Sequence, residues 1–573
     1  MLDMATLNTL GIRPPNVVMD LERLGTLSAS RLSFTRCLLR QMARQRWQIT
    51  TQRFDLDREG YGSSIYRLQT PNGRYHIVIF SQELTEEKRS DRVIADAWDL
   101  TFGVVEGDVE DALMESLAEN LPLQEAGRQH PQLLVISRAN KSKRNFEHFV
   151  EQLASGEQPN PQDLKTAGYL YRTTAVYGNG KFGIKDYFRL RDNLDFRQPF
   201  AAQMIALYVL RQFSIDQLEH IAENRAPDTA IKLNSDIQRF IGIGNSTGLG
   251  MAPFLINHPL LINHWIHCRE QALAIAKVST VDEAMQNRFV SLCVRALGYY
   301  MESDIEDHDQ AERNRIVISE LETVVSWLQQ VPCEDTLWYQ LTDWAEAALS
   351  LETQELLNSL LIELCPEAVE QLEDDQLVEE SMELIPDMPL IQLKQIIETQ
   401  FDWALSQDLD EPDERYWFWY RSIEKEEPRL GVRGVDQGVE KELSLAIGPR
   451  VQEVYKLVSE YLEDNATAVT IEFLMGQPRI VDAVRRIQSM SNTAYGEIRG
   501  NLWHRNMKPM HLLRTKLAFL GASRFDPLGD RWVRVTFFQG APSIAELNAE
   551  PLDLVEFDDW SFVNAPNIQE RCP

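Results

Sequence analysis

The chain has 573 residues, of which 44% are hydrophobic and 25% are charged, and its formal net charge is -30 with a pI near 4.8. This composition excludes a largely disordered chain, and the charge opposes general attraction to nucleic acid or to anionic membranes. The length predicts about three or four folding units.

The six cysteines are scattered without a C-x-x-C pair, a distribution that favours a reducing compartment over a disulfide scaffold. The first residues, MLDMATLNTLGIRPP, lack the basic and apolar pattern of a signal peptide. No window approaches the roughly 20 apolar residues that span a bilayer. We therefore expect a soluble, cytoplasmic protein.

Residues 28–49 carry apolar side chains at the three- and four-residue spacing of an amphipathic helix. Arg36, Arg40 and Arg44 form a stripe on another side of this helix. We interpret the stripe as a solvated face, and an acidic partner is the alternative.

Residues 63–80 alternate apolar and polar side chains on both sides of Pro71-Asn72-Gly73, a pattern typical of a β-hairpin. Short apolar runs at 97–105 and 132–137 predict further strands. The first 200 residues therefore read as a mixed α+β unit.

The middle of the chain has helical periodicity, and no strand pattern interrupts residues 278–405, so we expect a helical array there. Residues 351–415 hold nineteen acidic residues against two basic ones, together with regularly spaced leucines. We interpret this segment as packed helices whose acidic faces are solvated.

The C-terminal part reads as α+β again, with a strand, turn and helix over 467–488 and a strand at 531–540. Residues 485–534 carry ten basic residues against three acidic ones. Acidic neighbours in the same fold are the favoured explanation, and an anionic ligand is the alternative.

The predicted fold class is α+β and predominantly helical, with N-terminal and C-terminal mixed parts flanking a long helical middle. The predicted domains are residues 1–200, 201–427 and 428–573.

A glycine-rich segment at 242–259 contains Gly244-Asn245-Ser246-Thr247-Gly248, which matches the G-x-S-x-G nucleophile turn of α/β-hydrolases. Its glycines do not have the spacing of the dinucleotide-binding fingerprint. A serine hydrolase using Ser246 is one hypothesis, and a glycine-rich turn that caps the next helix is the structural alternative.

Two other segments combine cationic and polar residues. Residues 172–186 present Arg172 and Lys181 beside glycines, although the Walker pattern is not matched. Residues 489–511 offer Tyr495, Glu497 and His504 for acid–base chemistry beside three cations that suit an anion clamp. His264, His267 and Cys268 share a helix face, but we assign no metal because no paired ligand motif accompanies them.

The leading hypothesis is an enzyme that acts on a small anionic molecule, carrying a carboxylate or a phosphate, at a site built from loops 172–186, 242–259 and 489–511. A non-catalytic interaction protein with an acidic helical binding surface is the second hypothesis, and the serine hydrolase is the third. Reaction type, cofactor and oligomeric state are not determined. The candidate catalytic residues are His504, Glu497 and Tyr495, and the candidate substrate-binding residues are Arg499, Arg505, Lys508, Lys181, Arg172, Gly244, Asn245, Ser246 and Gly248.

Overall fold

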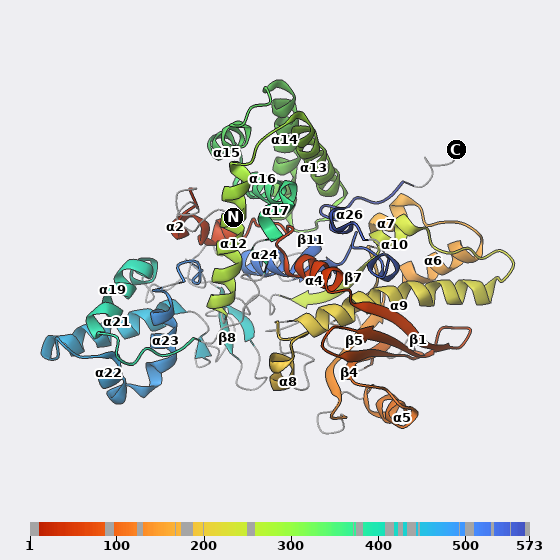
Figure 1. Ribbon diagram of the computed structural model, residues 1–573, viewed down its shortest axis with the longest axis horizontal. Helices are drawn as coiled ribbons and strands as arrows, with labels where there is room; N and C mark the ends of the chain where they lie inside the picture. The colour runs from red at the N-terminus through yellow and green to blue at the C-terminus, as the bar shows by residue number, and fades with distance from the viewer. Residues whose placement is uncertain are drawn as a thin grey trace. The chain divides into compact units, whose positions relative to one another are not determined.

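The fold is mixed α+β and mainly helical, as the sequence predicted (Figure 1). The computed structural model describes residues 11–85, 97–122, 130–166, 168–173, 187–198, 200–248, 258–370, 372–373, 382–406, 417–421, 428–432, 443–444, 447–491, 493–498, 509–528, 532–549 and 552–567. Within these ranges no helix is both long enough and apolar enough to cross a bilayer.

The chain forms two compact units, each assembled from three separate segments. Unit 1 comprises residues 1–28, 249–285 and 332–519, and unit 2 comprises residues 29–248, 286–331 and 520–573. The three consecutive domains expected from the sequence were defined by changes in composition, and that division stays a prediction.

Unit 2 contains a nine-stranded sheet with the strand order β1-β2-β3-β4-β5-β6-β7-β12-β11. Among these described strands, β6 and β7 pair in parallel and the other neighbours are antiparallel. The strands are β1 (Gln48–Leu56), β2 (Gly62–Gln69), β3 (Arg74–Ser81), β4 (Leu100–Glu106), β5 (Leu133–Lys141), β6 (Tyr169–Thr173), β7 (Gly242–Gly248), β11 (Ala522–Pro527) and β12 (Trp532–Phe537).

The predicted hairpin is confirmed, because β2 and β3 pair along their whole lengths and the Thr70 amide donates to the Gly73 carbonyl across the turn. The strands predicted at 97–105, 132–137 and 531–540 correspond to β4, β5 and β12. Alternation and turn chemistry are local properties, which is why the sequence reveals them.

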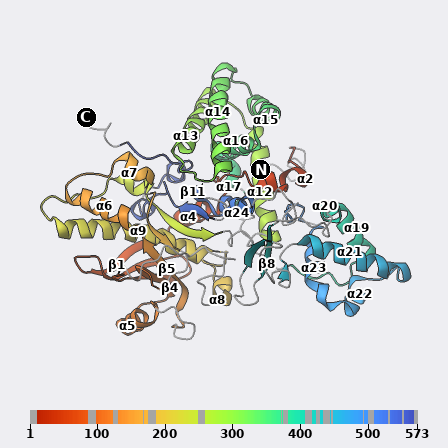
Figure 2. The same ribbon diagram turned by 180° about the vertical axis from the view of Figure 1, so that it is seen from behind.

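Helix α9 (Ala201–Arg225) packs on the sheet of unit 2, and α6 (Lys143–Ala154) lies beside it (Figures 1 and 2). Polar contacts support this packing, since the Tyr171 hydroxyl donates to Gln217 of α9 at 2.7 Å. Helix α5 (Asp111–Asn120) covers a small apolar cluster from β2 to β5. The other helices of this unit are α4 (Phe34–Arg44), α7 (Pro161–Thr166), α8 (Tyr187–Asp192), α10 (Ser235–Phe240), most of α13 (Glu283–Glu302), α14 (His308–Gln330), α25 (Ile544–Leu547) and α26 (Leu554–Phe557).

The arginine stripe of α4 is not a solvated face, and that interpretation was wrong for two of its three residues. Arg36 and Arg40 are buried, and both bind the carboxylate of Asp558, at 2.7 and 2.6 Å. Of the three arginines, Arg44 is the exposed one. Desolvation opposes the charge of Asp558, but the arginines around it hold the pKa of this carboxyl below its ordinary value.

Unit 1 contains a helical layer in which α12 (Pro259–Lys277) packs on α16 (Leu351–Leu364). The expectation that the acidic faces of this segment are solvated was wrong for α16, because Glu352, Glu355 and Glu363 are buried. Glu355 receives ion pairs from Arg13 at 2.6 Å and from Arg269 at 2.9 Å. Charge compensation across the layer therefore allows an acidic helix to enter the core.

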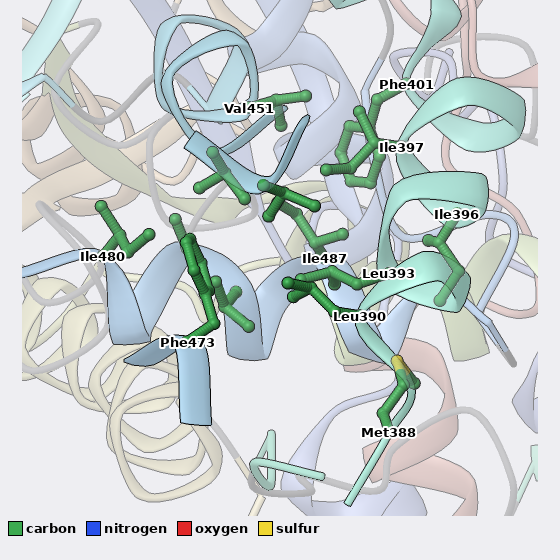
Figure 3. Packing of buried hydrophobic residues seen from close by; sticks show 14 of the residues in the cluster. Met388, Leu390, Leu393, Ile396, Ile397, Phe401, Val451, Phe473, Ile480 and Ile487 are labelled. Carbon is green, nitrogen blue, oxygen red and sulfur yellow. The ribbon is translucent and has the colours of Figure 1, made fainter. Parts of the chain in front are cut away.

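A second core of unit 1 lies among α19 (Leu390–Gln400), α21 (Ile447–Asp464), α22 (Thr470–Gly476) and α23 (Val481–Ser489) (Figure 3). The prediction of a strand at the start of residues 467–488 was wrong, since Thr470–Gly476 form the helix α22. Phe473 and Leu474 are adjacent in sequence and both enter this core, which a helix permits. Packing overrides the β-propensity of this segment.

Unit 1 also contains several further helices and a small sheet. They are α2 (Pro15–Val18), α3 (Leu21–Leu24), α15 (Leu337–Ala348), α17 (Pro366–Glu370), α20 (Asp402–Leu405), the 3₁₀ helix Pro478–Ile480, most of α24 (Pro509–Leu520), and the three-stranded sheet of β10 (Leu443–Ser444), β8 (Trp417–Arg421) and β9 (Pro428–Val432).

Candidate functional site

Seven of the twelve predicted site residues belong to the described part of the chain. Tyr495 and Glu497 belong to unit 1. The other five belong to unit 2, and they are Arg172, Gly244, Asn245, Ser246 and Gly248. The predicted residues outside the described ranges are His504, Arg499, Arg505, Lys508 and Lys181.

Tyr495 is buried and its polar groups are occupied. Its hydroxyl donates to the Arg13 carbonyl at 2.6 Å, its amide donates to Asn263 Oδ1 at 3.0 Å, and its ring stacks on His267. Burial, together with the charge of Glu270, raises the pKa of the phenol to about 12. Tyr495 therefore anchors its segment to α12 and to the N-terminal residues. This structural role accounts for a tyrosine at this position without a catalytic function.

Glu497 is also engaged within the fold. Both of its carboxylate oxygens accept hydrogen bonds from Arg486, one of them from Nη2 at 2.7 Å. Burial raises the pKa of Glu497, although Arg486 opposes the change. Three basic residues of segment 485–534 therefore have the acidic neighbours that were the favoured explanation, because Arg514 pairs with Glu352 and Arg534 with Asp304 as well.

The structure brings two of the predicted loops to neighbouring strands. In the parallel β6–β7 pair, Arg172 lies opposite Gly244 and Thr173 lies opposite Asn245. The described parts of the two predicted loops, 172–173 and 242–248, therefore lie on adjacent strands that run in the same direction.

Gly244 is required by a close contact. A Cβ atom at this position would lie 2.7 Å from the ring of Tyr169, well inside van der Waals contact. The glycine therefore lets the tyrosine ring lie flat against the strand.

The G-x-S-x-G residues form part of β7 and not the sharp turn that a nucleophilic serine needs. The backbone at Ser246 pairs with Arg534 of β12, and Gly248 pairs with Trp532. The predicted turn was therefore wrong, and the structure gives the hydrolase hypothesis no geometric support.

Asn245 is 2% exposed, and neither its carboxamide nitrogen nor its oxygen has a hydrogen-bond partner among the described residues. It neighbours Gly244 and Ser246 along β7, so its side chain projects from the opposite face of the sheet. A buried carboxamide without partners is unfavourable by roughly 1–3 kcal/mol.

The register across β7, β12 and β11 assembles a second set of polar residues that sequence reasoning missed. Gly244 lies opposite Thr536, which lies opposite Arg524, and Ser246 lies opposite Arg534, which lies opposite Asp526. Arg524, Asp526 and Arg534 therefore project from one face. We name Arg524, Asp526, Arg534, Tyr299 and Asp304 the β11 cluster.

Two members of the β11 cluster are buried with unfilled hydrogen-bonding capacity. Arg524 is 4% exposed, and its Nε and Nη2 atoms have no partner in the described part of the chain. Asp526 is 1% exposed, and within the same ranges its Oδ1 atom has none either. Such groups are rare in folded proteins, and they mark places where solvent, an ion or a ligand completes the hydrogen bonds.

Other members of the cluster surround these two groups. The guanidinium carbon of Arg524 lies 5.0 Å from the ring centroid of Tyr299 on α13, a cation–π contact. Arg534 pairs with Asp304 at 3.3 Å. Desolvation raises the pKa of the Tyr299 phenol, so this side chain stays protonated near neutral pH.

The carboxyl group of Asp526 has a raised pKa. Burial raises its pKa to about 6, while the charges of Arg524 and Arg534 act in the opposite direction. Carboxyl groups with such values exchange protons readily at physiological pH. A sequence signal did exist, because Arg524-Phe525-Asp526 places two charges on one face of a strand, yet it is weak without knowledge of burial.

Within the described ranges, no group of three or more histidine, cysteine, aspartate or glutamate residues has the arrangement of a metal site. His267 contacts the Tyr495 ring. Compared with known proteins, the chain matches no family model, no curated protein and no solved structure.

Proposed function

We propose that this protein is an enzyme that acts on a small anionic molecule bound at the β11 cluster. The observation that carries the proposal is that Arg524 and Asp526, two residues apart on β11, are buried and have hydrogen-bonding atoms without partners among the described residues. Burying a charged group without completing its hydrogen bonds destabilises a fold, and functional sites are where such arrangements concentrate.

Each residue has a chemical role in this proposal. Arg524 holds the acidic group of the substrate, because a guanidinium provides charge and directed N–H groups together. Asp526 takes or delivers a proton, for which a pKa of about 6 is suited. Tyr299 supports the guanidinium through the face of its ring.

The site differs from the one expected from the sequence, although the substrate class is the same. Arg172 and Gly244 lie in the same sheet row as Arg524, which supports a place for these two residues at its border. Tyr495 and Glu497 have structural partners, so Asp526 replaces them as the proposed acid or base.

We also propose a cytoplasmic location. Support comes from the described cysteines, none of which forms a disulfide with another described residue, as expected in a reducing compartment. The acidic net charge supports a small molecule over nucleic acid as the partner.

The test is a thermal-unfolding screen of the purified full-length chain against a panel of small metabolic acids and phosphates. A ligand at about 100 times its Kd stabilises a protein by roughly 2.7 kcal/mol, which is measurable as a change in Tm. We expect at least one anion to raise Tm in the wild type and not in Arg524→Gln. Arg315→Gln, on the exposed face of α14, is the matched control.

If no anion changes Tm, the proposal is wrong and a non-catalytic interaction protein becomes the better account. If the rise in Tm persists in Arg524→Gln, an anion binds elsewhere and the β11 cluster is not the site. Asp526→Asn should retain binding and lose turnover once a reaction is identified.

A further inference from the structure

The two unpartnered atoms of Arg524 lie on one edge of its guanidinium. Nε–H and the neighbouring Nη2–H point in parallel, so this edge presents two donors side by side. The guanidinium carbon lies over the ring of Tyr299, 5.0 Å from the ring centroid. A cation–π contact is not a hydrogen bond to an oxygen or nitrogen acceptor, so Nε–H and Nη2–H keep their capacity to donate to a ligand.

Two other largely buried arginines of this chain show what such an edge binds. In Arg13, Nε and Nη2 donate to the two oxygens of Glu270, with the Nε contact at 2.7 Å and the Nη2 contact at 2.8 Å. In Arg486, the same two atoms donate to the two oxygens of Glu497. Each edge chelates a planar carboxylate, whereas the edge of Arg524 meets no carboxylate of the described residues.

Asp526 does not take that place, although it lies two residues away on the same strand. Across the described ranges its Oδ1 atom has no partner, and neither do Nε and Nη2 of Arg524. The β11 cluster therefore combines an open carboxylate-binding edge with a separate carboxyl group that can donate or accept one more hydrogen bond.

We propose that the ligand of the β11 cluster is a monocarboxylate, chelated by Nε and Nη2 of Arg524 and hydrogen-bonded to Asp526. This inference rests on the function proposed above and narrows its substrate class. With Asp526 protonated, Arg524 and Arg534 carry one positive charge more than Asp304 offsets, and a monoanion balances this charge. A phosphate dianion would leave one negative charge uncompensated in a buried place.

Binding of a monocarboxylate is expected to be coupled to proton uptake by Asp526. The groups that face this carboxyl are Arg524 on its own strand, Arg534 on β12, Tyr299 on α13 and Asp304 beyond α13. The bound carboxylate adds negative charge beside Asp526 and so favours its protonated form. A protonated Asp526 donates to the ligand, so the affinity should fall by up to about tenfold per pH unit once the pH exceeds about 6, the pKa of Asp526 without ligand.

The experiment measures dissociation constants of acetate, propionate and benzoate for the full-length chain, each beside its neutral amide and beside inorganic phosphate. Saturation-transfer NMR or calorimetry is suitable between pH 6 and 8. Arg524→Lys keeps the charge and removes the two-donor edge, so we expect at least about a tenfold loss of carboxylate affinity. Asp526→Asn should abolish the pH dependence while retaining binding. Arg315→Lys is the control, and thermal unfolding checks that each variant is folded.

Carboxylate binding that depends on Arg524, with weaker binding of phosphate and amides, is the expected result. If phosphate binds more tightly than every carboxylate and still requires Arg524, the proposed function stands and the monocarboxylate inference is overturned. If no probe binds, both proposals fail, and ordered water is then the occupant of the cluster. An affinity unchanged in Arg524→Lys would also overturn the inference.

Discussion

Arg524 and Asp526 lie two residues apart on β11 and are both buried, yet Nε and Nη2 of the arginine form no hydrogen bond with Oδ1 of the aspartate. Elsewhere in the described chain, buried arginines such as Arg36 and Arg269 bind carboxylates directly. Burying the Asp526 carboxyl has an energetic cost that the charge of Arg524 only partly offsets, and this cost appears as the raised pKa of Asp526. Measurements of stability can therefore test the arrangement without knowledge of a substrate.

Replacing Asp526 by asparagine should stabilise the protein at pH 8. The folded pKa of about 6 exceeds the ordinary value of 3.8, so the fold resists the ionisation that the unfolded chain undergoes freely. A pKa difference of about 2 corresponds to roughly 3 kcal/mol. We therefore expect the free energy of unfolding, measured by urea denaturation, to rise by about 1–3 kcal/mol. The gain should be complete above pH 6, shrink between pH 6 and 4, and vanish at lower pH, where both states protonate the wild-type carboxyl.

The control for this comparison is Asp228→Asn, in an exposed turn of the same unit. It should leave the stability within about 0.5 kcal/mol of wild type at each pH. A destabilised Asp526→Asn protein at pH 8 would mean that Asp526 is ionised and satisfied by partners.

Gly244→Ala should destabilise unit 2. The added methyl group would lie 2.7 Å from the Tyr169 ring, which must then move away from β7. Overpacking of this kind costs about 1–3 kcal/mol, measurable by chemical denaturation. Gly476→Ala is the matched control because no described atom lies within 4 Å of its Cβ position. Equal effects of the two substitutions would contradict the packing of Tyr169 on Gly244.

Glu355→Gln should destabilise unit 1 strongly. The glutamate is fully buried and binds the guanidinium groups of Arg13, Arg23 and Arg269. Its removal leaves three largely buried cations with Glu270 as a remaining acidic partner, and breaking such a network costs about 3–5 kcal/mol. Thermal and urea unfolding provide the measurement, with Glu322→Gln on the exposed side of α14 as the control. A loss below about 1 kcal/mol would show that Glu355 is solvated.

Arg40→Ala and Arg44→Ala should differ although the residues are one helical turn apart. Arg40 is buried against Asp558, so its loss leaves a buried carboxylate with less compensation and costs about 3 kcal/mol or more. Arg44 is exposed, and its replacement should cost less than about 1 kcal/mol. Losses below about 1 kcal/mol for both variants would restore the solvated-stripe interpretation of α4.

Local patterns in the sequence determined the elements that depend on neighbouring residues. Alternation around Pro71-Asn72-Gly73 predicted β2 and β3, and helical spacing predicted α9 and α12, because turn chemistry and periodicity act over a few residues. The mixed, mainly helical class followed from the same patterns. The conformation of the glycine segment did not, since pairing with β6 and β12 turned an expected turn into β7.

Only the tertiary structure decided which charges are buried and which residues meet. Arg36 and Asp558 are 522 residues apart in sequence, and Arg13 and Glu355 are 342 apart, so no local pattern connects them. The β11 cluster arises in the same way, from the register of three strands and the placement of α13. Burial decides whether an arginine is solvated or offers unpaired N–H groups to a ligand. It is a property of the assembled sheet and helices and not of any single segment.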